Sequence, residues 1–174
     1  MIAATQRPPP PWTFGGPSQD YALSIDRTGP GAVAKLHARV AEPRDFASIT
    51  QSIRAARYRG QRVRFRATVR TVDVVGRAWL WLRVDGERGA PALAFDGMAR
   101  RPLDGSSAWA EHAVVLDVVE AARTLHFGFA MHGIGAFEVR DLAFEVVDAS
   151  VPLTAGETML ADEPANLELA DVTG

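Results

Sequence analysis

The chain has 174 residues, of which 47% are hydrophobic and 23% charged, and its formal net charge is -2. This is the composition of an ordinary single globular domain, and the near-neutral charge argues against nucleic acid or an anionic membrane as a partner. Cysteine is absent, which excludes disulfides, thiolate metal sites and a cysteine nucleophile.

The N-terminal segment is rich in proline. Residues 6–18 read "QRPPPPWTFGGPS", and consecutive prolines followed by Gly-Gly-Pro exclude a helix or a central strand. We therefore expect residues 1–14 to form an extended arm in front of a domain spanning residues 15–149. The first residues lack the apolar segment of a signal peptide, and no apolar run is long enough to span a membrane. The sequence thus predicts a cytoplasmic protein without a membrane partner.

Short segments of alternating polarity follow the arm, at residues 21–26, 32–40 and 46–53. The clearest alternation comes next, in residues 61–72, which read "QRVRFRATVRTV". A helix would scatter the arginines around its circumference, so the period of two predicts a strand. Phe65 then faces a core, while its arginine neighbours face away from it.

Residues 77–86, "RAWLWLRVDG", alternate in the same way. Leu80 and Leu82 are expected to face the core. The opposite face carries aromatic and charged side chains: Trp79, Trp81, Arg83 and Asp85.

The C-terminal half continues the pattern at residues 112–119, 124–132 and 136–148. In the middle segment, "TLHFGFAMH", two phenylalanines share the core face and two histidines lie opposite. Many short strands separated by turns predict an all-β fold, an antiparallel β-sandwich. The expected core includes Phe65, Leu82, Phe127, Phe129 and Phe144. The acidic residues 150–174 are expected to be a C-terminal tail.

Three stretches of the chain together resemble a bacterial jelly-roll family. They are "YRGQRVRFRATVRTVDVVGRAWLWLRVDG", "LAFDGMARRPLDGSSAW" and "VVLDVVEAARTLHFGFAMHGIGAFEVRDLAFEVV". The fold of that family is similar to the galactose-binding-like domains and to carbohydrate-binding modules of that shape. Its members occur alone or fused to helix-turn-helix regulators. The resemblance covers roughly residues 10–149 and implies a jelly-roll sandwich, whereas function has to be argued from the site.

The chain departs from the family pattern at three places. Gly97 stands where the family has Asn, Ala108 replaces the Asp before the tryptophan, and Arg140 precedes Asp141 where the family has two acids. Several sandwich modules of this shape hold a structural calcium ion near the closing strand. The resemblance therefore makes Asp141 the candidate calcium ligand, and the arginine beside it weakens that expectation. No other cofactor is expected.

The non-core faces of three strands carry the side chains that bind small polar ligands. An aromatic ring stacks on the apolar face of a sugar ring, and planar charged groups bind its hydroxyls. If the strands share one sheet, they form a single surface for a saccharide or another small molecule. The predicted ligand-binding residues are Trp79, Trp81, Arg64, Arg66, Arg83, Asp96, His126 and His132. Cross-strand salt bridges are the alternative role for the arginines, and burial under a loop is the alternative for Trp81.

The histidines also permit a catalytic interpretation. His126 or His132 is a candidate general base, with Asp85 as a candidate acid. Six residues of strand separate the histidines by roughly 20 Å, so they cannot share one metal ion or one dyad. The leading prediction is therefore a non-catalytic ligand-binding module. A cofactor-free cyclase, isomerase or lyase is the first alternative, and a sensory or protein-interaction module is the second.

Overall fold

The computed structural model describes residues 6–155, and every regular element in this range is a β-strand. The strands are β1 (Thr13–Gly15), β2 (Tyr21–Asp26), β3 (Val33–Ala38), β4 (Phe46–Arg54), β5 (Gln61–Asp85), β6 (Ala94–Asp96), β7 (Leu103–Gly105), β8 (Ala110–Val118) and β9 (Thr124–Val147). All strand pairs are antiparallel. The predicted fold class is confirmed. No helix that could span a membrane occurs between residues 6 and 155.

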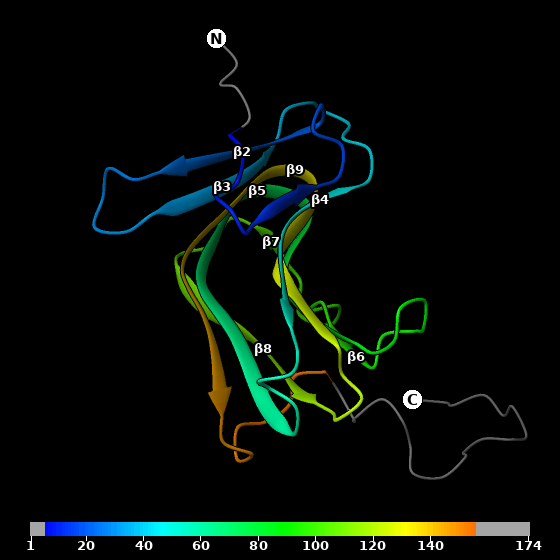
Figure 1. The fold of residues 1–174 in the computed structure, drawn as a ribbon. Coiled ribbons are helices and arrows are strands. Elements are labelled where there is room, and N and C mark those ends of the chain that lie inside the picture. The colour runs from blue at the N-terminus through cyan, green and yellow to red at the C-terminus, as the bar shows by residue number, and fades with distance from the viewer. Residues whose placement is uncertain (1–5, 156–174) are drawn as a thin grey trace, which may run out of the picture.

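Strands β5 and β9 form the frame of the molecule. They pair along nearly their whole length, from Arg62 opposite Val147 to Asp85 opposite Thr124. Figure 1 shows the two long strands curving together through the structure. Core-facing and outward-facing side chains alternate along both strands. Both halves of the β5–β9 ladder therefore contribute side chains to the core.

The β5–β9 ladder folds back on itself. Phe65 is paired with Phe144 in one half of the ladder, and Phe127 is paired with Leu82 in the other half. The ring centroids of Phe65 and Phe127 are nevertheless only 5.1 Å apart. The two halves therefore face each other across a core.

The fold-back occurs where the backbone takes conformations that favour glycine. The register of β5 against β9 shifts between Val72 and Val75. Gly76 has a φ of 126°, and Gly133, opposite it in the ladder, has a φ of 92°. A Cβ atom added to Gly133 would lie 2.0 Å from the Val75 carbonyl oxygen. The strands approach too closely here for a side chain, and this allows the ladder to turn.

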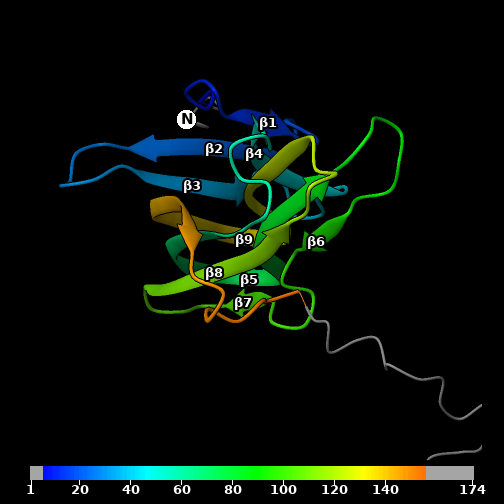
Figure 2. The ribbon, with the colours of Figure 1, turned by 60° about the horizontal axis from the view of Figure 1, so that its bottom comes forward.

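The folded ladder divides the sandwich into two layers. Layer A contains β2, β3 and β8 together with residues 61–72 of β5 and 136–147 of β9. Layer B contains β1, β4 and β6 together with residues 76–85 of β5 and 124–133 of β9. Figure 2 shows the β2–β3 hairpin beside β9 at the edge of layer A. Each layer has one face toward the core and one outer face.

The core follows the predicted alternation. Phe65, Leu82, Phe127 and Phe129 are buried between the layers, as expected. Phe144 is half-buried, and its ring still packs on Phe127 with 4.7 Å between centroids. Aromatic rings from both layers therefore form the centre of the hydrophobic core.

The described part of the proline-rich segment packs on the sandwich. The Trp12 ring contacts Phe127 and Phe129, with centroid separations of 5.7 and 6.4 Å. The backbone N–H of Gln6 donates to the Leu23 carbonyl oxygen over 2.8 Å. Strand β1 begins at Thr13, ahead of the predicted boundary at residue 15. The division into residues 1–14, 15–149 and 150–174 stays a prediction, and residues 1–5 and 156–174 lie outside the described residues.

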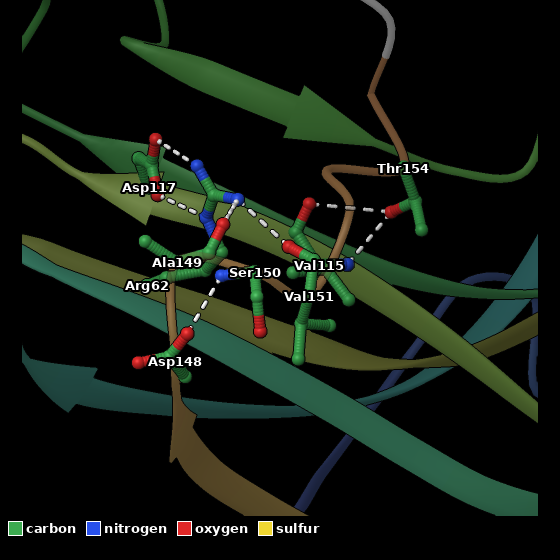
Figure 3. A network of polar contacts seen from close by, with 8 residues as sticks. All are labelled: Arg62, Val115, Asp117, Asp148, Ala149, Ser150, Val151 and Thr154. Atoms are coloured by element: carbon green, nitrogen blue, oxygen red, sulfur yellow. Dashed lines mark hydrogen bonds and ion pairs between the residues drawn. The ribbon is translucent and has the colours of Figure 1, made fainter.

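The beginning of the predicted tail is bonded to layer A (Figure 3). The Arg62 Nη1 atom donates to the carbonyl oxygens of Ala149 and Val151 over 2.8 and 2.7 Å. Thr154 exchanges hydrogen bonds with Val115 of β8, whose backbone N–H donates to the threonine Oγ1 atom over 2.6 Å. Residues 149–154 therefore extend the edge of the sandwich.

A chain that ends at Asp148 is expected to fold but to be less stable than a chain that ends at Ala155. The truncation removes the bonds from Arg62 and Val115 to residues 149–154. Since one such bond is worth about 0.5–1.5 kcal/mol, the free energy of unfolding should fall by about 2 kcal/mol or more. Urea unfolding of the two chains measures the difference, and equal midpoints would contradict the structural role of this segment.

Candidate functional site

The outer face of layer B collects the largest set of predicted site residues. Leu80 and Leu82 of β5 are buried in the core, so the residues between and beside them point outward. In the ladder, Trp81 lies opposite Gly128 and Arg83 lies opposite His126. The side chains on this face are Phe46, Ser48, Thr50 and Ser52 from β4, Arg77, Trp79, Trp81, Arg83 and Asp85 from β5, Phe95 from β6, and His126, Ala130 and His132 from β9.

The centre of this face is a groove, called the aromatic groove below. It has a volume of about 410 Å³, which is within the usual range for ligand sites. Trp81 is half-buried beside it, and Phe95 is 54% exposed. The residues that line it are Phe46, Ser48, Arg77, Trp79, Trp81, Arg83, Phe95, Gly97, Ala99 and Ala130.

Trp79 is less accessible than the sequence pattern predicts. Only 7% of the residue is exposed. Phe46 packs on its ring at a centroid distance of 5.8 Å, and the Arg77 guanidinium lies over it at 4.4 Å. Alternation places Trp79 on the outer face, but these neighbours from β4 and β5 cover it. Trp81 is therefore the tryptophan with more surface open to a ligand.

A polar cluster adjoins the aromatic groove at Arg83. The His126 Nδ1 atom lies 2.7 Å from the Ser52 hydroxyl, and its Nε2 atom lies 3.3 Å from the Asp85 carboxylate. Arg83 donates to the same carboxylate over 2.5 Å from its Nη2 atom. Ser52, His126, Asp85 and Arg83 thus form one connected chain of polar contacts.

The environment of His126 favours its neutral form. Burial lowers the pKa of His126 below its ordinary value, although the Asp85 carboxylate acts in the opposite direction. A neutral imidazole that donates its Nε2–H to Asp85 has a free lone pair on Nδ1 for the Ser52 hydroxyl. The cluster can therefore donate to and accept from ligand hydroxyls.

An open depression of about 950 Å³ borders the polar cluster. Its lining includes Arg83, Asp85 and His126 of the polar cluster, together with residues 86–90, Arg123 and Thr124. Because Arg83 also lines the aromatic groove, the groove and the depression meet at this arginine.

His132 lies at the far end of the same face. It is exposed and is paired with Phe46 of β4 and Arg77 of β5. The structure therefore divides the candidate catalytic residues: Asp85 and His126 are in contact, and His132 lies at the other end of the face, outside the groove lining. A catalytic role for any of the three stays a prediction.

Arg64 and Arg66 are not on this surface. They lie on the outer face of layer A, where both guanidinium groups bond to Glu145, at 2.6 and 2.7 Å. Arg66 also bonds to Glu111 at 2.9 Å. These hydrogen bonds lower the pKa of Glu145. The bend in β5 turns the outer faces of its two halves in opposite directions, so alternation alone wrongly grouped these arginines with Trp81.

Asp96 points toward the interior at the edge of layer B, because it is paired with the buried Leu82. Its carboxylate accepts hydrogen bonds from the Met98 backbone N–H at 2.8 Å and from Arg101 Nη2 at 2.6 Å. The same Arg101 atom donates to the Ala113 carbonyl oxygen of β8 over 3.1 Å. Asp96 and Arg101 therefore connect the two layers, a structural role that differs from the predicted role as a ligand acceptor.

The candidate calcium ligand Asp141 lies within β9, where the register against β5 shifts between Arg66 and Thr68; its φ is 53°, and its carboxylate lies 3.5 Å from Arg140 Nε. Between residues 6 and 155, no three His, Asp or Glu side chains are placed to hold one metal ion. The calcium site stays a prediction of the resemblance.

Ser52 is one of the site residues that the sequence pattern did not identify, as are the groove residues Phe46, Arg77 and Phe95. Ser52 becomes a partner of His126 through the pairing of β4 with β9, which places the two residues opposite each other. The segment of residues 46–53 alternates too weakly to single out this serine. Only the register between two strands that are distant in the sequence shows the contact.

Comparison with known proteins identifies one curated relative and many similar folds. No family model matches the chain. It is 39% identical over 129 residues to the "Uncharacterized HTH-type transcriptional regulator YbfP" of Bacillus subtilis (strain 168). The match includes 73% of this chain and only 43% of that protein. The chain therefore spans less than half of this relative.

The similar solved structures include several carbohydrate-binding modules. One is the CBM22-1–GH10 part of Clostridium thermocellum xylanase 10B complexed with xylohexaose, with a TM-score of 0.57, 11% identity, and 87% of this chain and 27% of that chain covered. A second is TmCBM61 in complex with β-1,4-galactotriose, with a TM-score of 0.51, 12% identity and coverages of 79% and 90%. A third is the xylan-binding domain from CBM22, with a TM-score of 0.54, 12% identity and coverages of 78% and 86%. These likenesses confirm the jelly-roll fold of carbohydrate-binding modules.

Proposed function

We propose that this chain, a β-sandwich with the fold of carbohydrate-binding modules, binds a saccharide in the aromatic groove. The observation that carries the proposal is the half-buried Trp81 ring beside an open groove on the outer face of layer B. Trp81 adjoins the exposed rings of Phe46 and Phe95 in this groove, and a contiguous exposed apolar patch marks an interaction site. An indole ring offers the flat apolar surface on which a pyranose ring stacks.

The groove also has polar groups for the hydroxyls of a sugar. Ser48 lines the groove, and Arg83 links the groove through Asp85 to His126 and Ser52. Because the polar cluster is held by its own hydrogen bonds, its donors and acceptors are oriented before a ligand arrives. Such preorganisation lowers the entropic cost of binding.

The similar structures support this proposal. Two of them are complexes with saccharides, β-1,4-galactotriose and xylohexaose, and a third is a xylan-binding domain. Because their sequence identity to this chain is 11–12%, they support the fold, and the groove residues support the ligand class.

Replacing Trp81 with alanine is expected to weaken saccharide binding about tenfold or more, because the stacking surface is lost. Isothermal titration calorimetry with a panel of oligosaccharides, xylohexaose and β-1,4-galactotriose among them, measures the change. Trp81→Phe keeps an aromatic ring and should retain most of the affinity.

Trp109 provides the matched control for Trp81. It lies on the outer face of layer A between Arg70 and Arg140, with cation-to-ring distances of 4.8 and 4.4 Å. Trp109→Ala should leave saccharide affinity unchanged. Equal losses in Trp81→Ala and Trp109→Ala, or no binding by the unaltered chain to any member of the panel, would contradict the proposal.

A sensory module is the second candidate function. The relative that matches most of this chain is named as a transcriptional regulator, and the described part of the chain contains only strands. The matched region is therefore a sandwich, which could serve a regulator as its ligand-binding part. Affinity that is already maximal for a monosaccharide or disaccharide would favour sensing, whereas affinity that rises with oligosaccharide length would favour polymer binding.

A further inference from the structure

The charged side chains that line the aromatic groove are all cationic. Arg77 and Arg83 line it, and no Asp or Glu does. The chain as a whole has a formal net charge of -2, so this local excess of positive charge belongs to the groove and does not reflect the overall composition. A positively charged groove favours an anionic ligand.

The arginines on the outer face of layer A have a structural role, because they form salt bridges across neighbouring strands. Arg62 bonds to Asp117, and Arg64 and Arg66 both bond to Glu145. Each of these cations is matched by a carboxylate on the neighbouring strand. Of the two groove arginines, Arg83 is paired with Asp85, and Arg77 departs from this pattern.

Arg77 has no carboxylate partner in the described part of the chain. Its guanidinium lies over the Trp79 ring at 4.4 Å, and the residue is exposed. The ring holds the cation in place by a cation–π contact, which needs no acceptor oxygen. Its hydrogen-bond donors are therefore available to a ligand.

Arg83 is committed to a carboxylate at the other end of the groove. Its Nε and Nη2 atoms donate to the same Asp85 oxygen over 3.0 and 2.5 Å. Arg77 is consequently the groove arginine whose N–H donors are available to an anionic ligand. A guanidinium group binds a carboxylate through two parallel hydrogen bonds, and such charge-assisted bonds are stronger than neutral ones.

We infer that the saccharide bound in the aromatic groove is acidic and that its carboxylate binds to Arg77. This inference rests on the proposed function and specifies its ligand class. Residues 77 and 81 are separated by about 13 Å along the strand. The ligand therefore stacks one sugar ring on Trp81 and presents a uronic acid carboxylate, from a neighbouring sugar, to Arg77.

The inference is tested with acidic polysaccharides and the same polymers after reduction of their carboxyl groups to alcohols. Glucuronoxylan, polygalacturonate and alginate are the probes, and affinity electrophoresis with calorimetry on their oligosaccharides gives the affinities. At least one acidic probe should bind about tenfold more tightly than its reduced form, because the reduced form lacks the charge-assisted pair. This preference should fall as the salt concentration rises.

Arg77→Ala should lower the ratio of acidic to reduced affinity to near one, and Arg77→Lys should restore part of it. Arg140→Ala is the matched control, because Arg140 also lies 4.4 Å from a tryptophan ring, that of Trp109 on the opposite face. The control should leave the ratio unchanged. Thermal unfolding of each variant verifies that it is folded.

The outcomes separate the two proposals. Equal binding of acidic and reduced forms, or an unchanged ratio in Arg77→Ala, overturns the inference while the saccharide-binding proposal stands. Binding of neither form by the unaltered chain, together with no binding to neutral oligosaccharides, overturns the proposed function itself.

Discussion

Replacing Phe127 with alanine is expected to lower the free energy of unfolding by about 3–5 kcal/mol. Phe127 is 4% exposed, and its ring contacts Phe65, Phe144 and Trp12 at centroid distances of 5.1, 4.7 and 5.7 Å. Phe65 and Phe144 belong to layer A, which faces Phe127 in layer B, and Trp12 belongs to the N-terminal segment. Removing the ring would leave a cavity at the point where all three meet, and chemical denaturation monitored by circular dichroism measures the cost.

The control for Phe127→Ala is Phe95→Ala, because Phe95 is 54% exposed on β6. Its removal should change stability by less than about 1 kcal/mol, since little apolar surface is withdrawn from water at this position. If Phe127→Ala were no more destabilising than Phe95→Ala, the assignment of the core face of β9 would be wrong.

Replacing Gly133 with alanine should also be strongly destabilising, by about 2–5 kcal/mol. Its φ of 92° would cost a side chain about 1–2 kcal/mol. The new Cβ atom would further lie 2.0 Å from the Val75 carbonyl oxygen, and such overpacking typically costs about 1–3 kcal/mol. The backbone of β5 could relieve the contact only by moving away from β9, which would open the bend of the ladder.

Gly89 separates these two effects. It has a φ of 87°, close to that of Gly133, but an added Cβ atom there would meet nothing within 4 Å. Gly89→Ala should therefore show the backbone cost alone, and urea unfolding of the two variants side by side measures the difference. Equal losses of stability would mean that the close approach of β5 and β9 at the bend contributes nothing.

The sequence by itself was sufficient to predict the fold class and the orientation of individual strands. Alternation in residues 61–72, 77–86 and 124–132 predicts strands, and it correctly places Phe65, Leu82 and Phe127 in the core. It also predicts that Trp81 and His126 face away from the core, and the structure brings them to one face. Whether that face binds a ligand stays a prediction.

The tertiary structure alone decided which outer faces belong together. Period-two alternation describes each strand relative to its own core face, and it contains no information about a bend that turns a strand around. Alternation assigns Arg64, Arg66 and Arg83 of β5 to the side away from the core. The bend in β5 places Arg64 and Arg66 on the outer face of layer A and Arg83 on the outer face of layer B.

The pairing register of strands that are distant in the sequence explains the remaining differences between the predicted and the observed site. The contact of Ser52 with His126 depends on the pairing of β4 with β9, and the covering of Trp79 depends on Phe46 from β4. Composition and alternation therefore determined that this protein is a β-sandwich with an aromatic and polar outer face. The pairing of distant strands, which has no local signature in the sequence, decided which residues meet there, because a strand's partner is selected by packing across the whole sheet.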